Sequence, residues 1–192
     1  MRSNFNTFTV FPRDWVVTAE QLMGLDPRML LLAFLSVLNR LGLRRVRAFL
    51  VIAIHGEYDA ATGLFHLHIH GLADQAAIAV LDLLRALPNF RCRRSLGEKQ
   101  RVRIGRTPMT NLPYPLTYIL QPYWPRRWRA TVEGVQRRGK IRHRIPEPHH
   151  TMLLLWLDQW SAQDMMLMVG TSVGRSGLVQ ISASPRGEEV SS

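Results

Sequence analysis

The chain is poor in cysteine, in acidic residues and in long apolar runs, and each shortage excludes a class of protein. A single cysteine, Cys92, among 192 residues rules out an intramolecular disulfide. No apolar run reaches the roughly 18 to 20 residues of a membrane span, so we expect no membrane partner. The first residues lack the apolar core of a signal peptide, and we expect a cytoplasmic protein. There is no Walker A loop, so any helicase activity would come from a partner.

The scarcity of acidic residues leaves a strongly basic chain. There are 14 Asp and Glu against 25 Lys and Arg, and the formal net charge is +11. Nearly all the basic residues are arginine, which pairs two N–H groups with one phosphate, so we expect a nucleic-acid partner.

The basic residues of greatest interest lie in two runs. One run flanks a hairpin that we expect to turn near 96–98, and the other interleaves arginines with aromatic rings, a pattern suited to stacking unpaired bases. The candidate DNA-binding residues are Arg91, Arg93, Arg94, Arg101, Arg103, Arg106, Trp124, Arg126, Arg127, Trp128 and Arg129. Solvated charge and partial burial of the two tryptophans under a loop are the alternatives.

Three histidines alternate with large apolar residues between Phe65 and Leu72. A strand sends alternate side chains to one face, so His66, His68 and His70 share a face. The apolar residues between them anchor the opposite face in a core. The pattern predicts a strand whose histidines could bind a metal. A polar strand end without a metal would give the same pattern.

A second strand is expected just upstream, from Val46 to Tyr58, followed by a short turn at 60–63. Antiparallel pairing would bring His55 or Glu57 beside the histidine strand. Imidazole and carboxylate groups from two adjacent strands suit manganese, magnesium, zinc or nickel.

The remaining pattern predicts one domain over residues 1–181 and a disordered tail over 182–192. We expect a strand at Thr7–Phe11 and helices at Arg28–Leu41, from Asp74 to Leu87, and over 146–170. This order indicates an α+β fold, with helices packed on one face of a sheet and a C-terminal helical extension.

A short helix is expected between the prolines that flank 114–121. Tyr114, Tyr118 and Gln121 are spaced i, i+4 and i+7, which places them on one helical face. Taken alone, the two tyrosines would be read as amphipathic core residues with surface hydroxyls.

The chain has, in order, an apolar helix, a strand ending in Ile54–Asp59, a Gly-containing turn, the histidine strand and the tyrosine helix. This order resembles that of the HUH endonucleases. It resembles in particular the rolling-circle plasmid replication initiators, over about residues 27–125. The resemblance implies an antiparallel HUH/RRM-like sheet, His68, His70 and His55 as ligands of Mn²⁺ or Mg²⁺, and Tyr118 as nucleophile with Tyr114 for a second transfer. It also implies single-stranded DNA at a replication origin as substrate, with a host helicase and polymerase as partners.

The chain departs from this family at Gln121, where the family has a lysine. An amide donates hydrogen bonds without charge, so Gln121 could orient a phosphate or, as in some small transposases of the superfamily, bind the metal; Glu57 and His66 are further candidates for either role. The alternatives to an initiator are therefore a catalytically weakened origin-binding or single-strand-binding protein, and a transposase or relaxase with the same chemistry.

Overall fold

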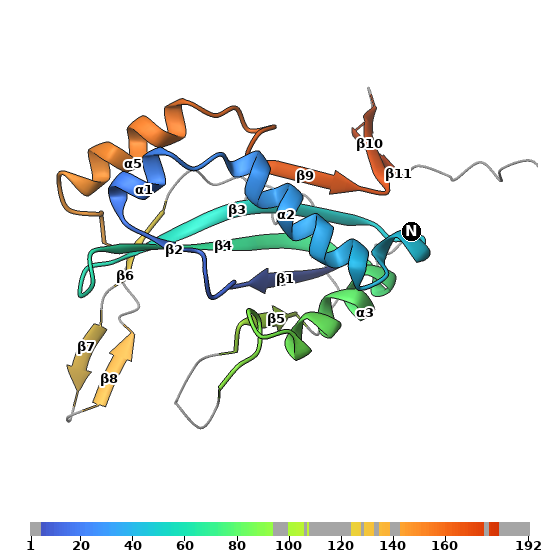
Figure 1. Cartoon of the computed structure of the whole chain (residues 1–192), viewed down its shortest axis with the longest axis horizontal. Helices are drawn as coiled ribbons and strands as arrows, with labels where there is room; N and C mark the ends of the chain where they lie inside the picture. Colours follow the sequence, from blue (N-terminus) through green and yellow to red (C-terminus); the bar gives the residue numbers. More distant parts are fainter. Residues whose placement is uncertain are drawn as a thin grey trace, which may run out of the picture.

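The computed structural model describes residues 5–93, 100–105, 107, 124–127, 129–132, 135–138, 143–174 and 177–180. For 129–132, 135–138, 171–174 and 177–180 it describes the backbone only. Within these ranges the protein is a mixed α+β structure in which helices cover one face of a central antiparallel sheet (Figure 1).

The strands are β1 Asn6–Val10, β2 Val16–Val17, β3 Leu50–Asp59, β4 Leu64–Ala73, β5 Val102–Ile104, β6 Arg126–Arg127, β7 Arg129–Val132, β8 Val135–Arg138, β9 Met166–Val169, β10 Thr171–Gly174 and β11 Gly177–Gln180. The α-helices are α1 Ala19–Met23, α2 Pro27–Arg40, α3 Gln75–Leu83 and α5 His149–Asp158, with single 3₁₀ turns at Leu43–Arg45 and Leu84–Ala86.

The described strands of the main sheet number seven, in the order β5-β1-β4-β3-β6, with β2 added to β4 and β9 added to β3. β3 and β4 are its centre and pair over their whole length, with Leu50 opposite Ala73 and Asp59 opposite Leu64. β7–β8 and β10–β11 are separate two-stranded sheets.

The core lies between the sheet and the helices. Alternation along β4 sends Phe65, Leu67 and Ile69 to the helical side, and all three are buried. They join one large apolar cluster with residues of α1, α2, α3 and α5, in which Phe34 and Trp156 are among the largest fully buried side chains. In Figure 1, α1, α2 and α5 lie along one side of β3 and β4.

Local signals in the sequence explain where these elements begin and end. Asp26 accepts a hydrogen bond from the backbone N–H of Arg28, and Pro27 is the first residue of α2. Asp74 caps α3 in the same way through Ala77. Gly63 has φ +72°, the left-handed conformation that the tight β3–β4 turn requires. The expected α2, α3, β1, β3 and β4 are thereby confirmed within a few residues.

One expected element is wrong. Residues 146–170 are not one helix, because α5 ends at Asp158 and Met166–Val169 form β9, which pairs with Leu50–Ala53 of β3. A turn at Ser161–Asp164, closed by the side chains of both residues, separates the two elements. The hairpin expected to turn near 96–98 lies largely outside the described residues; of the segments beside it, 91–93 form no strand and β5 pairs with β1.

Within the described ranges, no helix is long and apolar enough to cross a membrane. The tail expected at 182–192 lies outside the described residues.

Candidate metal centre

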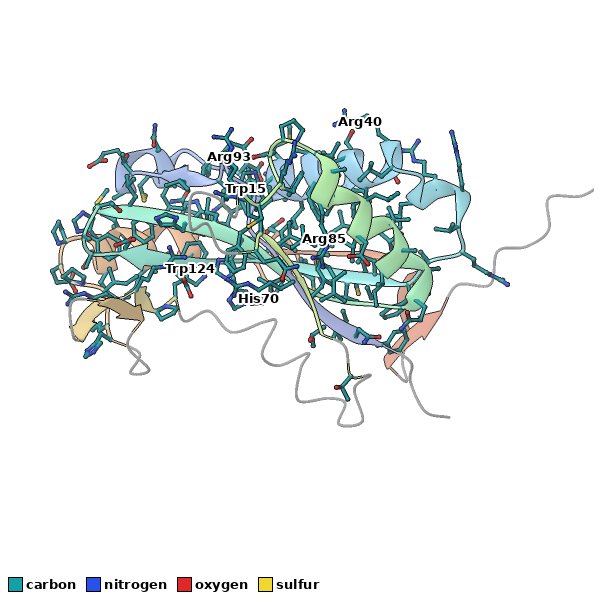
Figure 2. The ribbon with its side chains drawn as sticks, turned by 90° about the horizontal axis from the view of Figure 1, so that it is seen from below. Trp15, Arg40, His70, Arg85, Arg93 and Trp124 are labelled. Carbon is teal, nitrogen blue, oxygen red and sulfur yellow. The ribbon has the colours of Figure 1, made fainter. Side chains whose placement is uncertain are left out.

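The face of the sheet opposite the helices carries the histidines. His66, His68 and His70 alternate with the core residues of β4, as their spacing predicted. The register of the central hairpin puts His55 directly opposite His68, and Glu57 directly opposite His66. The two central strands therefore bring together the imidazoles that the sequence singled out. Figure 2 shows His70 on the side of the sheet away from Arg40, which belongs to α2.

Three imidazole rings form a compact group on this face. The Nε2 atoms of His68 and His70 are 3.0 Å apart, and the ring centres of His55 and His70 are 4.9 Å apart in an edge-to-face arrangement. The rings of His55 and His68 are separated by 6.2 Å. Two nitrogen ligands at about 2.0–2.1 Å from one ion are roughly 3 Å apart when their bonds make a right angle. The His68–His70 pair thus has the separation of two adjacent metal ligands.

Neighbouring groups orient two of the rings through their other nitrogens. His68 Nδ1 lies 3.2 Å from the backbone oxygen of His66, so Nδ1–H donates to that carbonyl. This leaves Nε2 of His68 as an acceptor, the form that binds a metal. The Thr9 hydroxyl lies 3.0 Å from His70 Nδ1. A consistent network has Thr9 donating to His70 Nδ1, and His70 Nε2–H donating to His68 Nε2.

The surroundings keep His70 uncharged. Burial first, and then the charges of His68 and His55, lower the pKa of His70 to about 3, and the Glu57 carboxylate opposes this shift only in part. A neutral imidazole is the form that ligates a divalent ion. His70 is therefore uncharged at neutral pH, and binding a metal through Nε2 requires only that the ring proton move from Nε2 to Nδ1.

The described side chains alone do not complete a metal cage. Among them, no group of three or more His, Cys, Asp or Glu residues is arranged to hold a metal ion. The geometry fits a two-imidazole site at His68 and His70 with His55 beside it, which leaves positions for further ligands. His55 as third ligand, and Mn²⁺ or Mg²⁺ as the ion, remain predictions.

Glu57 and His66, the further candidates, are directed to other groups. Glu57 Oε2 accepts from both Nε and Nη2 of Arg127, each at 2.9 Å. His66 Nε2 lies 4.0 Å from a carboxylate oxygen of the buried Asp59. These four side chains make a polar group next to the three rings on the same face. In this arrangement the Glu57 carboxylate is paired with Arg127, and its charge also acts on His70.

Several predicted site residues lie outside the described part of the chain. They are Tyr114, Tyr118, Gln121, Arg94, Arg106 and Trp128. Arg129 is described only by its backbone, in β7. The prediction of a tyrosine helix beside the histidines therefore stays a prediction.

Trp124 is a correction to the expected base-stacking residues. Its side chain is 2 % exposed and packs on the helical side of the sheet, with its ring centre 5.4 Å from that of Trp156 and 6.4 Å from that of Phe65. Gly56 leaves the room that the indole occupies, since a Cβ there would overlap the ring. A core indole has no free face for a base, so burial, the alternative considered for this residue, applies.

The described arginines before β5 and on it lie near the end of β1. Arg91 accepts through its backbone oxygen from the Arg13 guanidinium, and Arg101 donates to the backbone oxygen of Phe11. Arg93 belongs to the same segment, and Figure 2 shows it near Trp15, on the side of Arg40 and away from His70. A cluster of arginines thus surrounds the end of β1.

Two site residues were missed by the sequence reasoning. Phe11 stacks on His68, with ring centres 4.8 Å apart and an interplanar angle of 28°. Thr9 contacts His70, as described above. Both lie near the end of β1, about 60 residues from the histidine strand, and only the register Thr9–His70 brings them there. Nothing in the local pattern of 9–11 signals this contact.

No family model, curated protein or solved structure matches this chain.

Proposed function

We propose that the protein is a metal-dependent single-stranded DNA nicking and strand-transfer enzyme of the HUH type, acting at the origin of a rolling-circle plasmid. The observation that carries the proposal is the imidazole group on the open face of two central antiparallel strands, with His68 and His70 Nε2 atoms 3.0 Å apart. The helix-covered antiparallel sheet supports assignment to an HUH/RRM-like fold. The net charge of +11 supports a polyanionic substrate.

His68 and His70 would hold the divalent ion, with His55 as the third protein ligand. A bound Mn²⁺ or Mg²⁺ withdraws charge from the oxygens of the phosphodiester. Neutral His70 is suited to this role at pH 7 because its pKa of about 3 leaves it unprotonated.

Tyr118 would supply the nucleophile. Its oxygen attacks phosphorus, a bond from tyrosine oxygen to phosphorus forms, and the bond from phosphorus to the 3′ oxygen breaks. The tyrosine proton leaves to solvent, and the departing oxygen takes a proton to become a free 3′-hydroxyl. The 5′-phosphotyrosine conserves the bond energy, so the nick can be rejoined or passed to Tyr114. A polymerase then extends the 3′-hydroxyl, and a host helicase unwinds the duplex.

A covalent-adduct assay tests the proposal. The protein is incubated with single-stranded fragments of its own replicon and Mn²⁺, and a denaturing gel is searched for a protein–DNA band. We expect a band with wild type and with Arg40→Gln, a charge control on the helical side, and none with Tyr118→Phe or His68→Ala/His70→Ala. A band that persists in Tyr118→Phe would overturn the nucleophile assignment. No band with any fragment, with salt-sensitive binding retained, would instead support a catalytically weakened origin-binding protein.

A further inference from the structure

Two fixed guanidinium groups lie on opposite sides of the imidazole group, on the same face of the sheet. Arg103 belongs to β5, at one edge of the strand order, and pairs with Thr9, which in turn pairs with His70. Arg127 belongs to β6, at the other edge, and pairs with Asp59 of β3. Alternation therefore puts both arginines on the histidine face, with β4 and β3 between them.

Arg103 is held by stacking. Its guanidinium carbon lies 4.8 Å from the ring centre of Phe11, and the Phe11 ring also stacks on His68. The side chain is exposed to solvent, and its Nε donates to the backbone oxygen of Gln100. A column of guanidinium, phenyl ring and imidazole thus leads from the β5 edge to the candidate metal ligands. Stacking on an aromatic face restricts the guanidinium at little cost to its outward N–H groups.

Arg127 is held by a carboxylate. Its Nε and Nη2 both donate to Glu57 Oε2 at 2.9 Å, and the Glu57 and Arg127 side chains are 10 % and 21 % exposed. Ion pairs this sheltered are less weakened by solvent than surface pairs. An arginine has five N–H groups, so two bonds to Glu57 leave others able to meet a second acceptor.

We infer that a single strand of nucleic acid crosses the sheet diagonally from the β5 edge to the β6 edge, with Arg103 and Arg127 binding phosphates on either side of the imidazole group. Four strand spacings of about 4.8 Å separate the edges by roughly 19 Å. Arg103 is in register with Ala53 and Arg127 with Asp59, six residues or about 20 Å further along β3, so the diagonal is roughly 28 Å, a span of several nucleotides. Glu57 is then a positioning residue for Arg127, and not a metal ligand. The inference rests on the proposed function for the identity of the ligand, but not on cleavage.

The test measures binding without chemistry. Fluorescence anisotropy with labelled dT12 in EDTA gives the affinity at several salt concentrations. We expect Arg103→Gln and Arg127→Gln each to weaken binding several-fold, and each to reduce the slope of log K against log salt by about 0.7, the value for one phosphate on a single strand. Their combination should reduce the slope by twice that amount. With dT3, too short to reach both edges, the combined loss should not exceed the larger single loss.

Matched variants separate this path from net charge and from misfolding. Arg40→Gln removes the same charge from the helical side and should leave the slope unchanged. The double variant Glu57→Gln/Arg127→Gln keeps the net charge and leaves no carboxylate without its partner. It should reduce the slope of log K against log salt by the same amount as Arg127→Gln. The inference is overturned if either arginine changes the slope no more than Arg40→Gln does.

Metal binding decides the role assigned to Glu57. Isothermal titration with Mn²⁺ alone should show the same affinity, within about twofold, for wild type and Glu57→Gln/Arg127→Gln. A loss of tenfold or more would make Glu57 a ligand and overturn its positioning role. If wild type binds no Mn²⁺ while both arginines still alter dT12 binding, the proposed function fails and the strand path stands.

Discussion

The three imidazoles could be predicted from sequence because their geometry is local. A period of two residues places His66, His68 and His70 on one face whatever the rest of the fold does, and one short turn fixes His55 opposite His68. Phe11 and Arg127 complete the surroundings from distant segments, whose positions depend on tertiary pairing. The local pattern therefore predicted candidate ligands, but not the groups that orient them or compete for Glu57.

The half-buried imidazole of His70 makes a pH-dependent contribution to stability. Burial lowers its pKa from 6.5 to about 3, so between these values the unfolded chain binds a proton that the folded protein does not. The free energy of unfolding should then fall as the pH falls below about 6.5, by at most about 1.4 kcal/mol per pH unit from this group.

Urea denaturation of the metal-free protein at pH 7, 6 and 5 measures this dependence. His70→Gln should lose less stability than wild type over the same pH range, because glutamine does not titrate. Equal losses in the two proteins would show that His70 does not carry the effect.

Elements could be predicted from sequence where a helix-capping residue is followed by apolar residues at helical spacing. Asp26-Pro27 opens α2, and Asp74 opens α3, as expected. The helix predicted over 146–170 was too long because apolar residues continue past Asp158. The change from helix to strand depends on pairing with β3, which the local sequence does not show. A four-residue strand such as Met166–Val169 is too short to show a period of its own.

Asp74 should contribute more to stability than an ordinary helix cap. Its Oδ1 accepts from the Ala77 N–H at the start of α3, and its Oδ2 accepts from the Phe49 N–H next to β3. Asp74→Ala should lower the free energy of unfolding by about 1–3 kcal/mol, because it leaves two N–H groups without a partner.

Asp26→Ala is the matched control for this change. Asp26 caps only α2 and is engaged otherwise with the exposed Arg28, so its loss should cost about 0.5–2 kcal/mol. Chemical denaturation of both variants gives the comparison. A smaller loss for Asp74→Ala than for Asp26→Ala would contradict the double role.

At the scale of the whole molecule, metal binding should stabilise the fold, because the imidazole group exists only when β3 and β4 are paired. A ligand at 100 times its Kd adds about 2.7 kcal/mol when it binds the folded state alone. Adding Mn²⁺ should therefore raise Tm, and EDTA should reverse the rise. Thermal unfolding followed by tryptophan fluorescence measures it.

His68→Ala/His70→Ala should abolish the Mn²⁺-dependent rise in Tm, while Arg40→Gln should retain it. The same rise in the double histidine variant would place the ion elsewhere.

The position of β3 has a consequence for shortening the protein. Its run Leu50–Ile54 is buried, and β9 and β6 cover the side of the strand that β4 does not. A fragment that stops before Met166 would expose the backbone N–H and C=O groups of this apolar strand as an open edge, which is a template for pairing between chains. The C-terminal strand thus protects the histidine-bearing hairpin from self-association, and a minimal domain would need to include it.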